Sequence, residues 1–240
     1  MDNSLSVALS AQVALENRLN TIADNVANAN TVGFRATNIK FEDLVVGSGD
    51  KSMAFVSQGD TYLSDADGPL RATENPFDFA IRGDAWFAIQ TPAGMVVTRD
   101  GRFQMRETGD LVTLEGYPVL DAGGAAIQLN PRAGAPTSGA DGSLRQDGEL
   151  VGAVGLFQYD PGRNFTRFGN SGVIPDTPPQ PVVDNPAVGV VQGFVEDSNV
   201  NPVKEMTRLI MVQRAFENAA AALRTNESSL TEAIKTLGSK

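Results

Sequence analysis

The side chains that could carry chemistry in this sequence are mainly carboxylates. The 240-residue chain contains no histidine and no cysteine. Ser-His-Asp and Cys-His nucleophilic sites, zinc sites built on imidazole or thiolate ligands, and disulfides are therefore excluded. The 29 acidic and 19 basic residues leave a carboxylate pair, a lysine base or a carboxylate metal site as the formal options for an enzyme.

Two short runs resemble ligand-binding loops but fail on spacing. The run 65–68, Asp-Ala-Asp-Gly, begins like a calcium loop, yet Pro69 occupies its fifth position and Pro76 stands where a bidentate glutamate is needed. The run 47–52 contains glycine, lysine and serine, but the lysine does not follow a glycine at P-loop spacing. We predict a polar turn and a flexible loop, and we expect no cofactor and no metal.

Acidic residues are frequent in the central part of the chain, where two of them at a suitable separation could hydrolyse a glycosidic bond. Most of them lie at predicted turns, which favours a solvated acidic surface. Trp86 and Phe87 fall in an apolar run that is more typical of core packing than of a sugar-stacking platform. A carbohydrate-acting or carbohydrate-binding β domain stays open as the alternative of another class.

The distribution of charge divides the chain into two ends and a middle. Residues 1–45 and 201–240 together carry no net charge, so residues 46–200 hold the whole net charge of −10. This acidic balance argues against binding to nucleic acid. The sequence contains no apolar run of about 18 residues, the length needed for insertion across a membrane. The N-terminus also lacks the basic, then apolar, then small-residue segments of a cleaved secretory signal. By the general export rules the chain would be cytoplasmic.

The N-terminal end predicts a helix that begins near Asn3 or Ser4 and meets no glycine or proline before Gly33. Mostly apolar side chains recur at alternating spacings of three and four, at positions 5, 8, 12, 15, 19, 22 and 26. This period of about 3.5 residues is typical of a coiled-coil seam.

The C-terminal end repeats the same pattern from Leu209 to Leu237, with Asn226 as its one polar member. Asn201 and Pro202 provide a capping residue and a first-position proline, and Gly238 closes the helix. Two such narrow seams predict that the helices pair with each other, with other copies, or both. A helical hairpin that closes a globular domain is the alternative, although more than 150 residues separate the helices.

The middle predicts β structure, because apolar residues alternate in 77–81 and 95–97 and turn signals recur about every 8–12 residues. Further strand-like runs are 111–113 and 117–120. An antiparallel sandwich or barrel-like domain follows from this spacing. Residues 174–187 are rich in proline and predict a stiff, extended connector leading out of it. The fold class is therefore α+β, with N- and C-terminal coiled-coil helices flanking a mainly antiparallel β domain.

The run 24–35 ends the first helix with several amide side chains, a glycine suited to positive φ and an aromatic anchor. It resembles the N-terminal signature of the flagellar rod, hook and hook-filament junction family. Asp24, Val26 and Arg35 replace the asparagine, leucine and lysine of the family pattern, and Ala85 replaces a glycine further on. The resemblance continues in order through 75–87, 97–103, 111–120 and 199–217, so it covers nearly the whole chain.

Within this family the chain is most similar to the proximal-rod type, with a distal-rod or hook-type relative as the alternative. The resemblance implies a non-enzymatic structural subunit that polymerises through its terminal helices into the drive shaft transmitting torque for motility. Its implied partners are copies of itself, other proximal and distal rod proteins, and the flagellar type III export apparatus. It further implies export without a cleaved signal peptide to the periplasmic rod of the basal body.

The resemblance divides the chain into an inner rod domain formed by 1–45 and 188–240 and a middle, 46–187, that contains a linker, the β domain and the proline-rich connector. Within the inner rod domain, 188–240 supplies the return segment and the C-terminal helix. The predicted assembly interface comprises Leu15, Leu19, Ile22, Asn25, Val26, Asn28, Asn30, Gly33, Phe34, Leu209, Val212, Phe216, Leu223, Asn226, Leu230 and Leu237.

Overall fold

The computed structural model describes residues 2–41, 43–46, 53–56, 59–183 and 185–238, with the backbone alone in 2–8, 43–46, 53–56 and, apart from Ser228, in 226–238. The run 47–52, with its glycines and lysine, lies outside the described residues. The chain forms two compact units. We call them the helical unit, which contains Met1–Ala27, Thr37–Tyr62 and Asn201–Lys240, and the β domain, which contains Asn28–Ala36 and Leu63–Val200.

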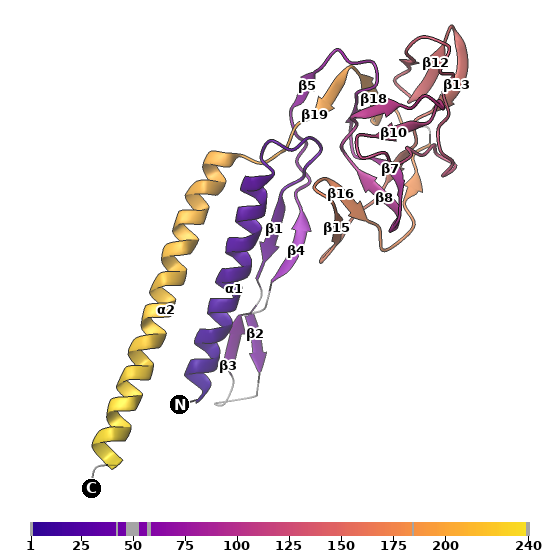
Figure 1. The fold of residues 1–240 in the computed structure, drawn as a ribbon. Helices are drawn as coiled ribbons and strands as arrows, with labels where there is room; N and C mark the ends of the chain where they lie inside the picture. Colours follow the sequence, from indigo (N-terminus) through magenta and orange to yellow (C-terminus); the bar gives the residue numbers. More distant parts are fainter. Residues whose placement is uncertain (1, 42, 47–52, 57–58, 184, 239–240) are drawn as a thin grey trace. The chain divides into compact units, whose positions relative to one another are not determined.

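The helical unit contains the two predicted helices, α1 (Asp2–Ala27) and α2 (Pro202–Gly238), which contact each other (Figure 1). Both helices are confirmed; the coiled-coil register between them remains a prediction. The unit also contains two pairs of short strands. These are β1 (Thr37–Lys40) with β4 (Asp60–Leu63), and β2 (Asp43–Val46) with its antiparallel partner β3 (Met53–Val56).

The start of α2 follows from its sequence. The Asn201 side-chain oxygen accepts a hydrogen bond from the backbone N–H of Lys204 at 3.0 Å, which satisfies a donor that the helix itself leaves unpaired. Pro202 occupies the first helical position, where its missing N–H removes no bond. Glu205 lies in the first turn, where the helix dipole favours a negative charge. The helix is described as far as Gly238, so its predicted closure there stays a prediction.

The β domain contains antiparallel sheets. The largest has six strands, which are, in order across it, β15 (Thr166–Phe168), β16 (Gly172–Ile174), β8 (Gly94–Thr98), β7 (Trp86–Thr91), β14 (Leu156–Gln158) and β17 (Gln180–Pro181). A smaller sheet contains β11 (Thr137–Ser138), β12 (Ser143–Gln146) and β13 (Glu149–Ala153). Three strand pairs complete the domain: β9 (Phe103–Met105) with β10 (Leu111–Thr113), β18 (Gly189–Gln192) with β6 (Phe79–Arg82), and β19 (Phe194–Glu196) with β5 (Leu70–Ala72).

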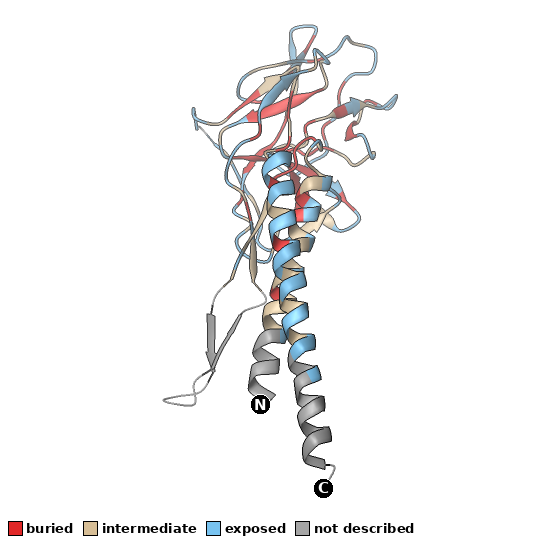
Figure 2. Cartoon of the chain, turned by 90° about the vertical axis from the view of Figure 1, so that its left-hand side faces the viewer, coloured by how far each residue is buried: buried red, intermediate tan, exposed pale blue. Residues whose placement is uncertain are grey.

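The buried residues concentrate in the β domain, whereas most coloured helical residues are exposed or intermediate (Figure 2). Three phenylalanines lie at the centre of the largest apolar cluster. The ring of Phe103 lies 5.3 Å from that of Phe87 and 6.0 Å from that of Phe79, centroid to centroid. Gly101 passes so close to the Phe79 carbonyl that a Cβ atom would lie 1.8 Å from its oxygen. Trp86 is buried in a neighbouring cluster, which confirms the core-packing interpretation.

The strands differ from the sequence prediction at two places. Residues 118–120 form only isolated bridges, because the three successive residues pair with three different segments, at Val112, Ile89 and Ala126. Within the proline-rich run 174–187, which was predicted to lead out of the domain, Gln180–Pro181 pairs with β14 at the edge of the largest sheet. Strands β18 and β19 follow within the β domain. The assignment of 188–240 to an inner rod domain remains a prediction.

Two leucines of the β12–β13 hairpin allow a matched test of the core. Leu144 is 0% exposed and Leu150 is 62% exposed. We expect Leu144→Ala to lower the free energy of unfolding by about 2–5 kcal/mol, because it removes buried methyl groups and leaves a cavity. Leu150→Ala should change it by less than about 0.5 kcal/mol. Urea denaturation of the two variants measures the difference, and equal losses would contradict the packing of this hairpin.

Candidate functional site: a buried ion-pair cluster in the β domain

The segment that follows α1 belongs to the β domain and is held there at Gly33. This residue has a φ of 69°, as predicted from the sequence, and a Cβ atom would lie 2.2 Å from the backbone nitrogen of Asp100. Only glycine permits both the conformation and the close approach. Its N–H donates a hydrogen bond of 2.7 Å to the carbonyl oxygen of Glu196. The signature thereby meets the end of β19.

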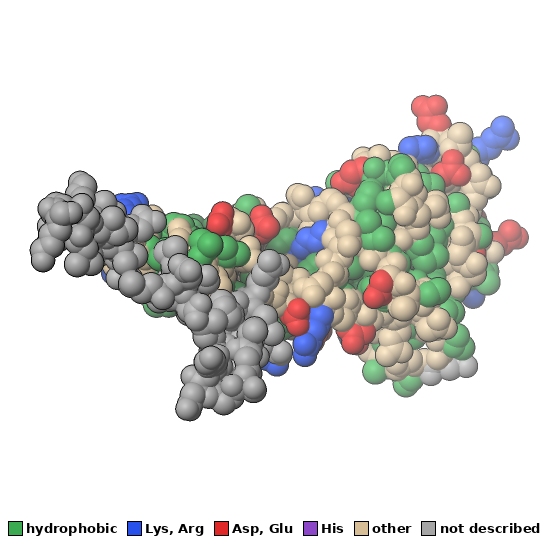
Figure 3. All heavy atoms as spheres, turned by 90° about the horizontal axis from the view of Figure 1, so that it is seen from below, with side chains coloured by type: hydrophobic (Ala, Val, Ile, Leu, Met, Phe, Trp, Pro, Cys, Tyr) green, Lys and Arg blue, Asp and Glu red, His purple; other side chains and the backbone are tan. Residues whose placement is uncertain are grey.

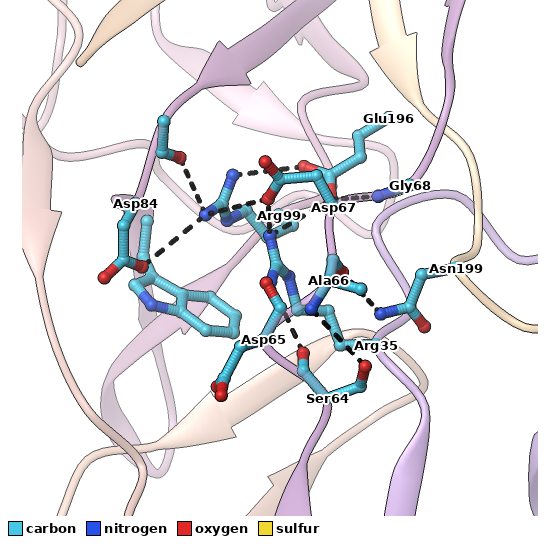
Figure 4. Close-up of polar contacts among 12 residues, drawn as sticks. Arg35, Ser64, Asp65, Ala66, Asp67, Gly68, Asp84, Arg99, Glu196 and Asn199 are labelled. Carbon is cyan, nitrogen blue, oxygen red and sulfur yellow. Dashed lines mark hydrogen bonds and ion pairs between the residues drawn. The ribbon is translucent and has the colours of Figure 1, made fainter. Parts of the chain in front are cut away.

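Arg35, two residues further on, is buried and surrounded by acceptors. Its Nη2 lies 2.6 Å from Oδ1 of Asp67 and 3.3 Å from Oε1 of Glu196. Its Nη1 donates to the carbonyl oxygens of Ser64, at 3.4 Å, and Asp65, at 3.1 Å. The loop between β4 and β5 therefore folds around this guanidinium, as Figure 4 shows.

Arg99, in the turn after β8, reaches the same carboxylate from another direction. Its Nη1 lies 3.2 Å from Oε2 of Glu196, and its Nη2 donates to the carbonyl oxygen of Gly83 at 3.0 Å. Oε1 of Glu196 also accepts the backbone N–H of Gly68 at 3.1 Å. Both guanidinium groups lie over the Trp86 ring, that of Arg35 at 5.7 Å and that of Arg99 at 5.4 Å from its centroid. Each arrangement permits a cation–π attraction.

The electrostatics of this cluster depend on Glu196, because it is the buried anion between two buried cations. Asp67, which also contacts Arg35, is 61% exposed at its side chain and is therefore more strongly screened by water. Burial lowers the pKa of Arg99 from its ordinary value, Glu196 opposes that change and Arg35 adds to it. Arginine stays protonated in proteins, so the unfavourable burial of its charge has to be offset by the carboxylate.

Each arginine also retains an unpaired donor. The Nε atoms of Arg35 and Arg99 find no hydrogen-bond partner among the described residues. The other donors of both guanidinium groups bind segments of the chain that lie far apart in the sequence. Among the residues that the structure describes, no group of three or more acidic side chains is placed to hold a metal ion.

A second set of contacts holds the signature next to Arg35. The Arg167 guanidinium lies 4.4 Å from the centroid of the Phe34 ring, and its Nη2 donates to the carbonyl oxygen of Arg35 at 2.6 Å. Oδ1 of Asn199 accepts the N–H of Ala36 at 2.7 Å. Gly33 and Phe34, predicted to lie at an assembly interface, are thus buried inside the β domain.

The other predicted interface residues lie on the helices or at the end of α1. Asn25 makes a reciprocal pair with the backbone of Thr37, donating to its carbonyl at 2.8 Å and accepting its N–H at 2.9 Å. Asn28 accepts a hydrogen bond from the Thr31 hydroxyl at 3.1 Å, and Asn30 is exposed. Ile22 and Val212 are buried, whereas the following side chains are partly exposed: Leu15, Leu19, Val26, Leu209, Phe216 and Leu223. The side chains of Asn226, Leu230 and Leu237 lie outside the described residues.

Three family models match the chain. "Flagella basal body rod protein" matches residues 5–35, "Flagellar hook protein FlgE/F/G D1 domain" matches 80–152, and "Flagellar basal body rod FlgEFG protein C-terminal" matches 191–236. Over the full length of both chains the sequence is 69% identical to the flagellar basal-body rod protein FlgF of Mesorhizobium japonicum. It is 54% identical to FlgF of Rhizobium meliloti over 99% of each chain.

The chain belongs to the FlgF type of the flagellar basal-body rod family. The rod protein FlgG of Bacillus subtilis is 30% identical over 98% of each chain, well below the two FlgF relatives. The cluster joins the three matched segments, because each of them supplies one of its members. Arg35, Arg99 and Glu196 come from the N-terminal, D1 and C-terminal segments respectively.

The cluster was not predicted from the sequence. From the sequence, Arg35 is only a replacement for lysine in the family pattern, Arg99 falls within the matching run 97–103, and 65–68 is a predicted polar turn. The one available signal was a charged residue directly after the apolar anchor Phe34. The partner, Glu196, lies 161 residues away along the chain. Such a pairing leaves no periodic trace in the sequence.

We expect Glu196→Gln to lower the free energy of unfolding by about 3–5 kcal/mol, because it leaves two buried guanidinium groups without their shared anion. The neighbouring Asp197→Asn is the matched control. Asp197 pairs with Arg71 at 3.0 Å, but the two side chains are 32% and 53% exposed, so its loss should stay below about 1 kcal/mol. Guanidinium or urea denaturation distinguishes the two, and a small effect of Glu196→Gln would show that the cluster does not hold the domain together.

Proposed function

We propose that the chain is a structural subunit of the flagellar basal-body proximal rod, which polymerises through its terminal helices into the drive shaft that transmits torque. Membership of the FlgF-type rod family supports the rod assignment. On this proposal its partners are copies of itself and other rod proteins. The distal-rod alternative is less well supported, because two FlgF relatives are 69% and 54% identical to the chain, against 30% for FlgG of Bacillus subtilis.

The observation that carries the proposal is a second apolar face on α2. Val203 is 74% exposed, Met206 52% and Ile210 53%. At about 100° per residue these three side chains lie within an arc of about 60°, and Val212, which is 6% exposed, points the opposite way. We call Val203, Met206 and Ile210 the outer stripe. Within the described part of the chain, nothing covers it enough to bury these side chains.

A helix of a monomeric protein normally places its apolar side chains on one face. The inner face of α2 includes the buried Val212, and α2 contacts α1 of the same chain. The outer stripe therefore suits a helix supplied by another subunit. When such contacts are heterologous and do not close into a ring, they generate a helical polymer, which is the form that a shaft requires.

The surface chemistry favours a structural role over binding to nucleic acid. On the face shown in Figure 3, acidic and basic side chains are scattered among hydrophobic and neutral ones, without a large basic area among the coloured residues. The chain as a whole carries a net charge of −10, so phosphate backbones would be repelled. None of the described helices is both long and apolar enough to span a bilayer.

The alternative of a carbohydrate-acting or carbohydrate-binding β domain had two supports, the acidic content of the domain and Trp86. The second is lost, because the Trp86 side chain is buried and two guanidinium groups already lie over its ring. We further propose that the chain performs no catalysis. Its location as a rod subunit would be the periplasmic part of the basal body, reached through the flagellar type III export apparatus without a cleaved signal peptide.

We expect Ile210→Asp to abolish swimming and to reduce incorporation into purified basal bodies by at least about tenfold, because it places a charge in an apolar helix contact. The purified monomer should keep its thermal stability, since Ile210 is exposed there. Leu150→Asp, at a similarly exposed leucine of the β domain, is the control and should leave assembly intact. Normal swimming of the Ile210→Asp strain would refute assembly through the outer stripe.

A further inference from the structure

A pocket of about 230 Å³ opens in the β domain beside the turn between β15 and β16. One part of its lining is aromatic, since the rings of Tyr117 and Phe168 meet edge to face with their centroids 5.6 Å apart. Ile89 of β7 adds an apolar side chain. We call this the Tyr117–Phe168 pocket. It is formed by residues outside the Arg35–Arg99–Glu196 cluster.

One carboxylate of the pocket forms no hydrogen bond or ion pair with the described residues. Asp100 also lines it, but Arg102 binds both of its oxygens, with Nε 2.9 Å from Oδ1 and Nη2 2.6 Å from Oδ2. Glu115 is exposed and forms no hydrogen bond or ion pair with any described residue. The pKa of Arg102 is raised mainly by its hydrogen bond to Asp100, and the negative charge of Glu115 raises it further. Glu115 therefore remains available to a cation from outside.

The size of the pocket limits its occupant. Sites for small molecules usually enclose about 300–1,000 Å³, so 230 Å³ is better suited to a single long side chain. Aromatic rings attract cations, and a free carboxylate binds the two parallel N–H groups of a guanidinium. Lysine lacks this planar, two-donor geometry. Apolar lining, aromatic rings and a carboxylate at the same opening together specify arginine.

We propose that the Tyr117–Phe168 pocket receives an arginine side chain of a neighbouring rod subunit, held by the Glu115 carboxylate. Charge complementarity supports this occupant, because residues 46–200 carry the whole net charge of −10. The β domain already contains the aromatic part of such a contact, since the Arg167 guanidinium lies 4.4 Å from the Phe34 ring centroid and 5.3 Å from that of Phe165. The inference rests on the proposed function, since it assigns a contact between subunits of the rod.

The first experiment measures binding to the isolated full chain by NMR, with N-acetyl-arginine amide as the probe. We expect shifts of the Tyr117 and Phe168 ring signals, and an affinity that falls about tenfold in Glu115→Gln, because a charge-assisted hydrogen bond is lost. Glu149→Gln, at an exposed acid of β13, should leave the affinity unchanged. Equal binding of the uncharged analogue N-acetyl-citrulline amide, or of a chitotriose probe in place of arginine, would overturn the proposal.

The second experiment tests the contact inside the rod. Because the chain contains no cysteine, Asn170→Cys at the rim of the pocket introduces a unique thiol and leaves Glu115 in place; a reagent carrying thiol-reactive and arginine-reactive ends can join it to a neighbour in purified basal bodies. We expect a product with another rod subunit from Asn170→Cys and none from Glu149→Cys. Incorporation of the Asn170→Cys chain without a crosslink would overturn the pocket assignment and leave the rod function standing. Failure of the rod function itself would appear separately, as absence of the unsubstituted chain from purified basal bodies.

Discussion

The structure depends on one carboxylate that two buried arginines share. Glu196 holds Arg35 at 3.3 Å and Arg99 at 3.2 Å, and its loss would leave two buried guanidinium groups without their shared anion. The chain enters the β domain at residues 28 and 63 and leaves it after residues 36 and 200. Residues 36, 63 and 200 each lie within a few residues of a member or neighbour of the cluster. The cluster thereby holds the β-domain end of these three connections.

The sequence predicted the features that arise from contacts between near neighbours along the chain. Both helices follow from uninterrupted periodicity, the start of α2 from Asn201 and Pro202, and the positive φ of Gly33 from its place after a helix. Several strands follow from alternation, and β10 occupies the predicted residues Leu111–Thr113. In each case the determining side chains lie within a few residues of the structure that they specify. The fold class could therefore be predicted without knowledge of any long-range contact.

The cluster could not be predicted in that way, because its members are joined across 97 to 161 residues by single charged side chains. A lone arginine has no periodicity, and its usual place in a protein is the surface. Long-range pairing is also missing from the prediction for the proline-rich run. The sequence predicts a connector at Gln180–Pro181, but these residues pair with β14 in the structure. Composition predicts an extended backbone there; it does not predict which strand lies beside it.

The burial of the signature bears on two roles that its sequence suggests, namely packing within the subunit and contact with other subunits. Gly33 and Phe34 lie inside the β domain, so within this fold they have little surface to offer another subunit. Their hydrogen bonds and ring contacts instead hold the segment that leads away from α1.

A subunit that transmits torque needs such stiffness within itself as well as contacts with its neighbours. Buried ion pairs with defined geometry suit the first requirement, because they break only at a large cost. Exposed apolar and aromatic surfaces suit the second, because they can be covered when subunits meet.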